Sequence, residues 1–297
     1  MGDYIPKHMS EPTETTLEVR GRKVAARVWG QASAPPVLAM HGWLDNAVSF
    51  DALAPLLPEL HLVAVDLPGH GLSDHHPPGA PYHYVDWITD VTAIVDALGW
   101  DRFSIMGHSM GAGIACLFTG TFPKRVERLV LLDGLGPLTE EPDNAPERLA
   151  TGIRRLLMTD DKTPKPLPDR ELAAKKMVEV VPGLTLASAR LLLARGMKDV
   201  PGGVVWRADP RLRVPSLFRL TQPHVHAFLR RIECPVLLVW GQDGYRFDRS
   251  WVQGQLDCLA NAKVVGLRGG HHVHLDDAAS VAPHVREHFS VGGGAVN

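Results

Sequence analysis

The chain is poor in cysteine. It holds three cysteines in 297 residues, Cys116, Cys234 and Cys258, and no two of them have C-x-x-C spacing. A sparse, odd-numbered set argues against a disulfide framework and against a thiolate metal site. We therefore expect a cytoplasmic protein from a reducing compartment.

Long apolar runs and clusters of one charge sign are also missing. No stretch approaches the roughly 20 apolar residues needed to span a bilayer, and the N-terminus lacks a secretory signal. The formal net charge is -2, with lysine and arginine spread along the chain. These absences predict no membrane span and no nucleic-acid partner.

What the chain does contain is a recurring pattern of short apolar runs, each too short for a helix. Two β-branched stretches, 16–20 and 23–29, precede them and read as an N-terminal hairpin. Near-continuous apolar runs separated by helical patterns, such as 84–98, predict a mostly parallel sheet with helices on both faces. The runs lie at 36–40, 61–65, 103–106, 129–132, 235–240 and 263–267.

The strand and helix rhythm breaks between about residues 136 and 230. Leucine, arginine and alanine dominate that stretch, and prolines punctuate it. We expect 16–136 and 231–291 to form an α/β core and 137–230 to form a helical lid, with helices near 145–158 and 184–196. Residues 1–15 are expected to be a tag remnant and a disordered N-terminus.

A nucleophile motif follows the run at 103–106. The sequence Gly107-His108-Ser109-Met110-Gly111 stands between a predicted strand and a predicted helix, which is the setting of a nucleophile elbow. Glycines at 107 and 111 let strand and helix approach closely while the serine is held in a strained conformation. The alternative, a nucleotide-phosphate loop, lacks the lysine of a P-loop and any G-x-G-x-x-G register.

Two backbone N–H groups are candidates for an oxyanion hole. The N–H of Met110 begins the helix after the elbow, and the N–H of Trp43 follows the strand at 36–40 in His41-Gly42-Trp43. We expect the side chains of Trp43 and His108 to line the substrate pocket. His41 is expected to brace this loop.

Asp66 and His70 follow the run at 61–65 and are expected to have structural roles.

The histidine-rich segment after the last predicted strand supplies the base. Adjacent residues cannot both point into one site, and the Gly270-His271 step makes His271 the first candidate, with His272 second. Metal binding by His271, His272 and His274 with Asp276 is the competing interpretation. Because the serine motif already accounts for a histidine here, we expect no metal and no cofactor.

Two aspartates can serve as the acid that orients this histidine. Asp133 follows the strand at 129–132, and Asp243 follows the strand at 235–240. Both obey the chain order of serine, acid and histidine found in α/β-hydrolases. Asp243 stands one residue earlier than the usual spacing from the preceding glycine, and the choice between them stays open.

Several segments together resemble the serine hydrolase-like proteins of the α/β-hydrolase superfamily. They are His41–Asn46, Gly69–Ser73, Trp100–Ile105, the GHSMG elbow and the HHVHL segment at 271–275. The resemblance implies a lidded fold without a cofactor, with Ser109 as nucleophile and His271 as base, and it favours Asp133 as the acid.

These observations predict a serine hydrolase that attacks an ester, thioester, lactone or related carbonyl bond with an apolar acyl part, through an acyl-enzyme intermediate. The expected partner is a small-molecule substrate, and the expected state is a monomer or homodimer. A hydrolase-fold receptor with little turnover and a carbon–carbon bond hydrolase remain alternatives.

Overall fold

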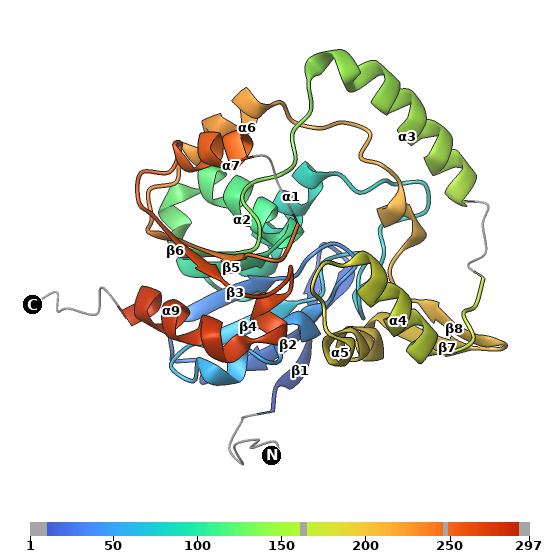
Figure 1. Ribbon diagram of the computed structural model, residues 1–297, viewed down its shortest axis with the longest axis horizontal. Coiled ribbons are helices and arrows are strands. Elements are labelled where there is room, and N and C mark those ends of the chain that lie inside the picture. The colour runs from blue at the N-terminus through green and yellow to red at the C-terminus, as the bar shows by residue number, and fades with distance from the viewer. Residues whose placement is uncertain (1–10, 161–164, 246–248, 291–297) are drawn as a thin grey trace, which may run out of the picture.

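One eight-stranded sheet forms the centre of the molecule. The computed structural model describes residues 11–160, 165–245 and 249–290, and Figure 1 shows helices covering both faces of the sheet. The strand order is β1-β2-β4-β3-β5-β6-β9-β10. The pairs β1·β2 and β2·β4 are antiparallel, and every other neighbouring pair in this sheet is parallel. This is the expected mostly parallel α/β architecture.

The strands lie where the short apolar runs predict them. The hairpin and the six later strands are β1 (Thr13–Val19), β2 (Arg22–Trp29), β3 (Pro36–Met40), β4 (His61–Val65), β5 (Phe103–His108), β6 (Val126–Leu132), β9 (Val236–Gly241) and β10 (Ala262–Leu267). The side chains alternate between two cores, since Leu38 packs into one and Val37 into the other. Strands buried on both faces read as continuous apolar runs, which is why the sequence reveals them.

The first core lies between one face of the sheet and α1 (Tyr84–Ala97), α2 (Met110–Thr121) and α6 (Gln222–Leu229). α7 (Arg249–Leu256) packs at its margin. The second core lies on the opposite face. Its covering elements are η1 (Ala47–Phe50), η2 (Ala54–Leu56), α8 (Val273–Asp276) and α9 (Ala278–Ser290).

Two predicted details at the ends of the sheet differ from the structure. β1 begins at Thr13, inside the segment expected to be disordered, because Thr13 to Thr15 pair with β2 in register. Residues 1–10 of that segment, which include the expected tag remnant, lie outside the described residues. β10 is not buried on both faces, because it is the edge strand, and Val264 is 50% exposed.

Residues 137–230, hereafter the insert, connect β6 to β9 and are mostly helical in their described part. They form α3 (Ala145–Asp160), α4 (Arg170–Val180), α5 (Leu186–Gly196), η4 (Pro142–Asn144), η5 (Pro210–Arg213) and α6. A hairpin of β7 (Met197–Val200) and β8 (Gly203–Trp206) is an element that the sequence interpretation missed. In Figure 1, α4 and α5 lie together beside β7 and β8, whereas α3 stands apart from them.

A short turn, η3 (Pro123–Arg125), completes the elements and joins α2 to β6. Among the described residues, no helix is both long enough and apolar enough to cross a membrane.

Candidate active site

Ser109 lies at a sharp bend between β5 and α2. Its φ and ψ angles are 51° and -111°, a conformation that side-chain-bearing residues rarely adopt. A Cβ atom on Gly107 would lie 2.5 Å from the Gly111 carbonyl oxygen, and one on Gly111 would lie 2.1 Å from the Met40 carbonyl oxygen. Only glycine fits at both positions, so the close approach of helix and strand holds Ser109 in its strained conformation.

The imidazole of His271 reaches this serine from the loop after β10. Its Nε2 atom lies 2.9 Å from Ser109 Oγ, within hydrogen-bonding distance. The side chain is 8% exposed, and the ring of Tyr245 lies edge-on to it with the centroids 4.6 Å apart. His272, the second candidate, points away from Ser109 and hydrogen bonds Asp45 instead.

Asp133 occupies the other side of the His271 ring. Its Oδ2 atom lies 2.6 Å from His271 Nδ1, and its Oδ1 accepts a 2.8 Å hydrogen bond from the backbone N–H of Gly241. Because a carboxylate only accepts hydrogen bonds, Nδ1 carries the proton and Nε2 presents its lone pair to Ser109. The three side chains form a continuous chain of hydrogen bonds.

Asp243 takes no part in these hydrogen bonds. Its carboxylate is exposed and accepts a 3.3 Å hydrogen bond from the backbone N–H of Gly269. The following residue, Gly244, packs against Asp133, since a Cβ there would lie 2.9 Å from Asp133 Oδ2. Asp243 braces the loop after β9 at the edge of the sheet.

The two candidate oxyanion donors lie on neighbouring parts of the fold: Met110 follows Ser109 in the chain, and Trp43 follows the strand that pairs with β5. Met110 is the first residue of α2, so its N–H has no acceptor within the helix. Trp43 follows β3, the strand that pairs with β5, and its ring is 52% exposed. The indole N–H donates a 2.9 Å hydrogen bond to the carbonyl of Leu212 in the insert.

His41 and Asp66 brace the loop that carries Trp43. His41 Nε2 accepts a hydrogen bond from the backbone N–H of Leu67, and its Nδ1–H donates to the Gly42 carbonyl oxygen at 2.7 Å. Burial lowers the pKa of His41 to about 4, so the ring is neutral. Asp66 accepts hydrogen bonds from the backbone N–H groups of Ala47 and Leu72.

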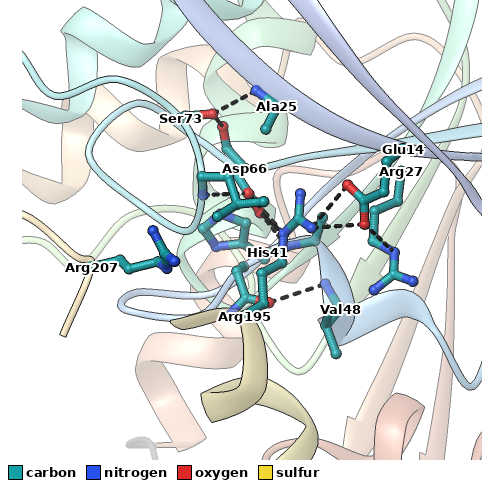
Figure 2. A network of polar contacts seen from close by, with 12 residues as sticks. Glu14, Ala25, Arg27, His41, Val48, Asp66, Ser73, Arg195 and Arg207 are labelled. Carbon is teal, nitrogen blue, oxygen red and sulfur yellow. Dashed lines mark hydrogen bonds and ion pairs between the residues drawn. The ribbon is translucent and has the colours of Figure 1, made fainter. Parts of the chain in front are cut away.

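An ion-pair network that the sequence interpretation missed joins the insert to this region, and it is buried at Arg195 and Asp66. Arg195 of α5 hydrogen bonds Asp66 through Nε at 2.8 Å and Glu14 of β1 through Nη1 at 2.8 Å. Figure 2 shows its guanidinium between these two carboxylates, with Arg27 on the far side of Glu14. Residues 14, 66 and 195 are distant along the chain, and no local motif marks them as partners.

His108 was expected to line the substrate pocket. This side chain is fully buried at the end of β5, beneath the site. Its Nε2–H donates a 2.9 Å hydrogen bond to the backbone carbonyl of His271. Its burial follows from its place as the last residue of β5, a strand whose residues are all buried.

The competing metal set does not converge. His274 hydrogen bonds Ser49, and Asp276 hydrogen bonds Thr185 of the insert. The described residues that do bring three candidate ligand atoms within 4.8 Å of one another are Asp45, His108 and His272, all buried.

Known proteins resemble this chain over nearly its whole length. A sequence model of the alpha/beta hydrolase fold family matches residues 35–278. A serine hydrolase-like protein of Dictyostelium discoideum is 34% identical, with 94% of this chain and 82% of that protein covered. A hypothetical protein from Pseudomonas aeruginosa PAO1 has a crystal structure that matches with a TM-score of 0.87 and 40% identity, covering 95% of this chain and 100% of that one. A thioesterase domain from the curacin biosynthetic pathway matches with a TM-score of 0.81 and 28% identity, covering 93% of this chain and 99% of that one.

Proposed function

This chain belongs to the alpha/beta hydrolase fold family and, within it, to the serine hydrolase-like proteins, and we propose that it hydrolyses an ester, thioester, lactone or related carbonyl bond with an apolar acyl part. The observation that carries the proposal is the 2.9 Å distance between His271 Nε2 and Ser109 Oγ, with Ser109 held at a positive φ. A strained serine facing an unprotonated imidazole nitrogen is the arrangement that nucleophilic catalysis requires.

In the first half of the reaction, His271 Nε2 takes the proton of the Ser109 hydroxyl as Oγ attacks the carbonyl carbon. The carbonyl oxygen gains the negative charge and accepts hydrogen bonds from the N–H groups of Trp43 and Met110. The protonated His271 then gives its proton to the leaving oxygen or sulfur, and the acyl group remains bonded to Ser109.

Water completes the cycle. His271 takes a proton from the water molecule as its oxygen attacks the acyl-enzyme carbonyl, and returns that proton to Ser109 Oγ when the carboxylic acid leaves. Asp133 stabilises the His271 imidazolium that forms in both halves and keeps the ring in the tautomer with Nδ1–H. No step in this sequence needs a metal or an organic cofactor.

The insert acts as a lid in this proposal. Two contacts support that role: the Trp43 indole bonds Leu212, and the backbone N–H of His271 donates a 3.0 Å hydrogen bond to the Pro182 carbonyl oxygen. The insert therefore touches both the loop of the oxyanion donor and the loop of the base. A movement of the insert would therefore shift both the oxyanion donor and the base.

An apolar acyl part is supported by the exposed apolar side chains near these loops and on the insert. Trp43 and Tyr245 are 52% and 41% exposed. Leu149, Ile153 and Leu157 recur every fourth residue on α3 and are 46%, 43% and 65% exposed, so one side of this helix offers an apolar surface. The similarity to a thioesterase domain supports including thioesters among the candidate substrates.

The proposal is tested by hydrolysis of p-nitrophenyl esters and acyl thioesters of increasing chain length. We expect turnover with an optimum beyond acetyl, and a loss of about 10⁵-fold or more in kcat for Ser109→Ala. Ser290→Ala is the matched control, because its exposed hydroxyl lies at the end of α9. Equal turnover by wild type and Ser109→Ala would refute the proposal, and ligand binding without any turnover would favour a receptor.

A further inference from the structure

A buried carboxylate lies directly beneath the loop of the oxyanion donor. Asp45 Oδ2 lies 2.9 Å from His272 Nε2 and 3.4 Å from His108 Nδ1, and all three side chains are at most 4% exposed. A Cβ atom added to Gly42 would lie 2.9 Å from both Asp45 Oδ2 and His108 Nδ1. The loop backbone at Gly42 therefore packs directly against this cluster.

Each member of the cluster is a close neighbour in sequence of a group that the proposed mechanism uses. Asp45 stands two residues after Trp43, His108 immediately precedes Ser109, and His272 immediately follows His271. His108 also donates from Nε2 to the backbone carbonyl of His271. Asp45 thus connects the oxyanion loop to the base loop through its bond with His272, and it packs against His108 at the end of the nucleophile strand.

The cluster contains an ion pair, although burial opposes ionisation of both of its partners. Burial opposes ionisation of His272, but the charge and hydrogen bond of Asp45 outweigh it and raise the pKa of His272. Burial likewise opposes ionisation of Asp45, and the charge and hydrogen bond of His272 outweigh it and hold the pKa of Asp45 well below the ordinary value. Burial lowers the pKa of His108 to about 3, so His108 is neutral and the ion pair is Asp45 with His272.

The loop between Trp43 and Asp45 needs such an anchor. Leu44 has a φ of 65°, which is unfavourable for a residue with a branched side chain. Asn46, on the other side of Asp45, donates a 2.9 Å hydrogen bond to the carbonyl of Leu192 in the insert. The strained residue is therefore held in place by partners that lie on other elements.

Resting on the proposed function, we infer that Asp45 is a positioning residue: through its ion pair with His272 it fixes the N–H of Trp43 relative to Ser109 and His271. Removing the link displaces an oxyanion donor and the base relative to the nucleophile. Misplacement by about 1 Å is enough to cost about 100-fold in rate. Substrate binding by the pocket walls is left largely unchanged.

The test compares the rate at which a fluorophosphonate probe labels Ser109, together with kcat and KM for a p-nitrophenyl ester. Asp45→Asn keeps the shape of the side chain and removes its charge, and we expect labelling and kcat to fall about 10- to 100-fold with KM within about twofold. The control is Ser49→Ala, which removes a buried hydrogen bond to His274 in the same core. It should lower the thermal midpoint while leaving the labelling rate within about twofold.

A second pair of variants covers the case in which Asp45→Asn does not fold. His272→Gln keeps an N–H donor near the position of Nε2, whereas the shorter His272→Asn cannot reach Asp45. We expect the Gln variant to keep most of the labelling rate and the Asn variant to lose it. Equal rates in both variants, or an Asp45→Asn protein labelled as fast as wild type, would overturn the inference.

Two further outcomes have distinct meanings. If wild type itself is not labelled at Ser109, the proposed function fails, and the role of Asp45 fails with it. Because three ligand atoms lie within 4.8 Å of one another here, the metal content of the same preparations is measured. One equivalent of tightly bound zinc per chain would replace the hydrogen-bonded account with a metal-bound one.

Discussion

Asp133 Oδ2 lies 2.6 Å from His271 Nδ1, on the side of the imidazole opposite Ser109. Both of its oxygens are engaged, because Oδ1 also accepts the N–H of Gly241 from the neighbouring strand. The carboxylate is 1% exposed, and its two hydrogen-bond donors fix its orientation. Asp133 is therefore well placed to select the tautomer of His271.

Replacing this carboxylate by an amide tests the acid directly. Asp133→Asn can present an N–H to Nδ1, which favours the wrong tautomer and leaves Nε2 protonated toward Ser109. We expect kcat to fall by about 10⁴-fold. Asp243→Asn is the matched control and should stay within about twofold, since that carboxylate is exposed and bonds the Gly269 amide. The reverse ranking would assign the acid to Asp243.

The elbow makes a prediction about stability. Gly111→Ala would place a Cβ 2.1 Å from the Met40 carbonyl oxygen in the sheet, so strand and helix must separate. We expect a loss of about 3 kcal/mol or more in the free energy of unfolding, measured with urea. Gly202→Ala is the control: it has a φ of 87° but open space, and should cost about 1–2 kcal/mol. A Gly111→Ala protein as stable as this control would contradict the packing at the elbow.

Much of the site could be predicted because its signals are local. Ser109 is marked by its two glycines, and His271 by its place after the last strand. The residues alone left the acid open between Asp133 and Asp243, and only the family resemblance favoured Asp133. The choice depends on the direction in which each carboxylate faces at the ends of two neighbouring strands, which no local motif shows. In the structure, Gly244 packs against Asp133, whereas the exposed Asp243 bonds the backbone N–H of Gly269.

The missed features depend on contacts between distant segments. Arg195 reads as one basic residue at the end of a lid helix, yet it reaches Glu14 and Asp66 on the core. The β7–β8 hairpin lies within a stretch whose composition indicates helices. Similarly, the apolar side chains of β10 predict a buried strand. β10 is in fact the edge strand, with a neighbour on one side only, and its sequence does not show this.

Arg195 gives a second stability prediction. Its side chain is 7% exposed and pairs with the fully buried Asp66, so Arg195→Met leaves that carboxylate without its cation. We expect a loss of about 3–5 kcal/mol in the free energy of unfolding. Arg170→Met, which breaks a pair with the largely exposed Asp199, should cost about 1 kcal/mol or less. Equal losses in the two variants would contradict a buried role for Arg195.

Fully buried histidines predict acid instability. Burial lowers the pKa of four of them, to about 4 for His41, about 3 for His70 and His108, and well below 6.5 for His274. The folded protein keeps these rings neutral, while the unfolded chain protonates them below about pH 6.5. Stability therefore falls as the pH drops from 6.5 toward 4, by about 1.4 kcal/mol per pH unit for each ring.

Three groups modify this slope. Burial lowers the pKa of the partly buried His288 to about 4, so this ring adds to the slope as the four above do. Burial raises the pKa of Asp51 to about 6, more than Arg27 lowers it, so the folded state gains one proton in the same range and offsets one histidine. His272, with its raised pKa, is protonated in both states below pH 6.5 and adds no slope there. About four net protons, or about 5 to 6 kcal/mol per pH unit, remain.

Urea unfolding at several pH values between 7 and 5 measures this slope. In His70→Gln the slope should fall by about 1.4 kcal/mol per pH unit, whatever the variant does to stability at pH 7. A free energy of unfolding that does not change over this range would mean that these rings are already protonated, or solvated, in the folded protein.

The most direct test of the account is the site at which a fluorophosphonate reacts with the native protein. Mass spectrometry of the peptides from the labelled protein locates the adduct. The account predicts one phosphonyl group per chain, on Ser109, and no adduct in His271→Gln on the same timescale. An adduct on another residue, or equally fast labelling of Ser109 without the His271 imidazole, would contradict it.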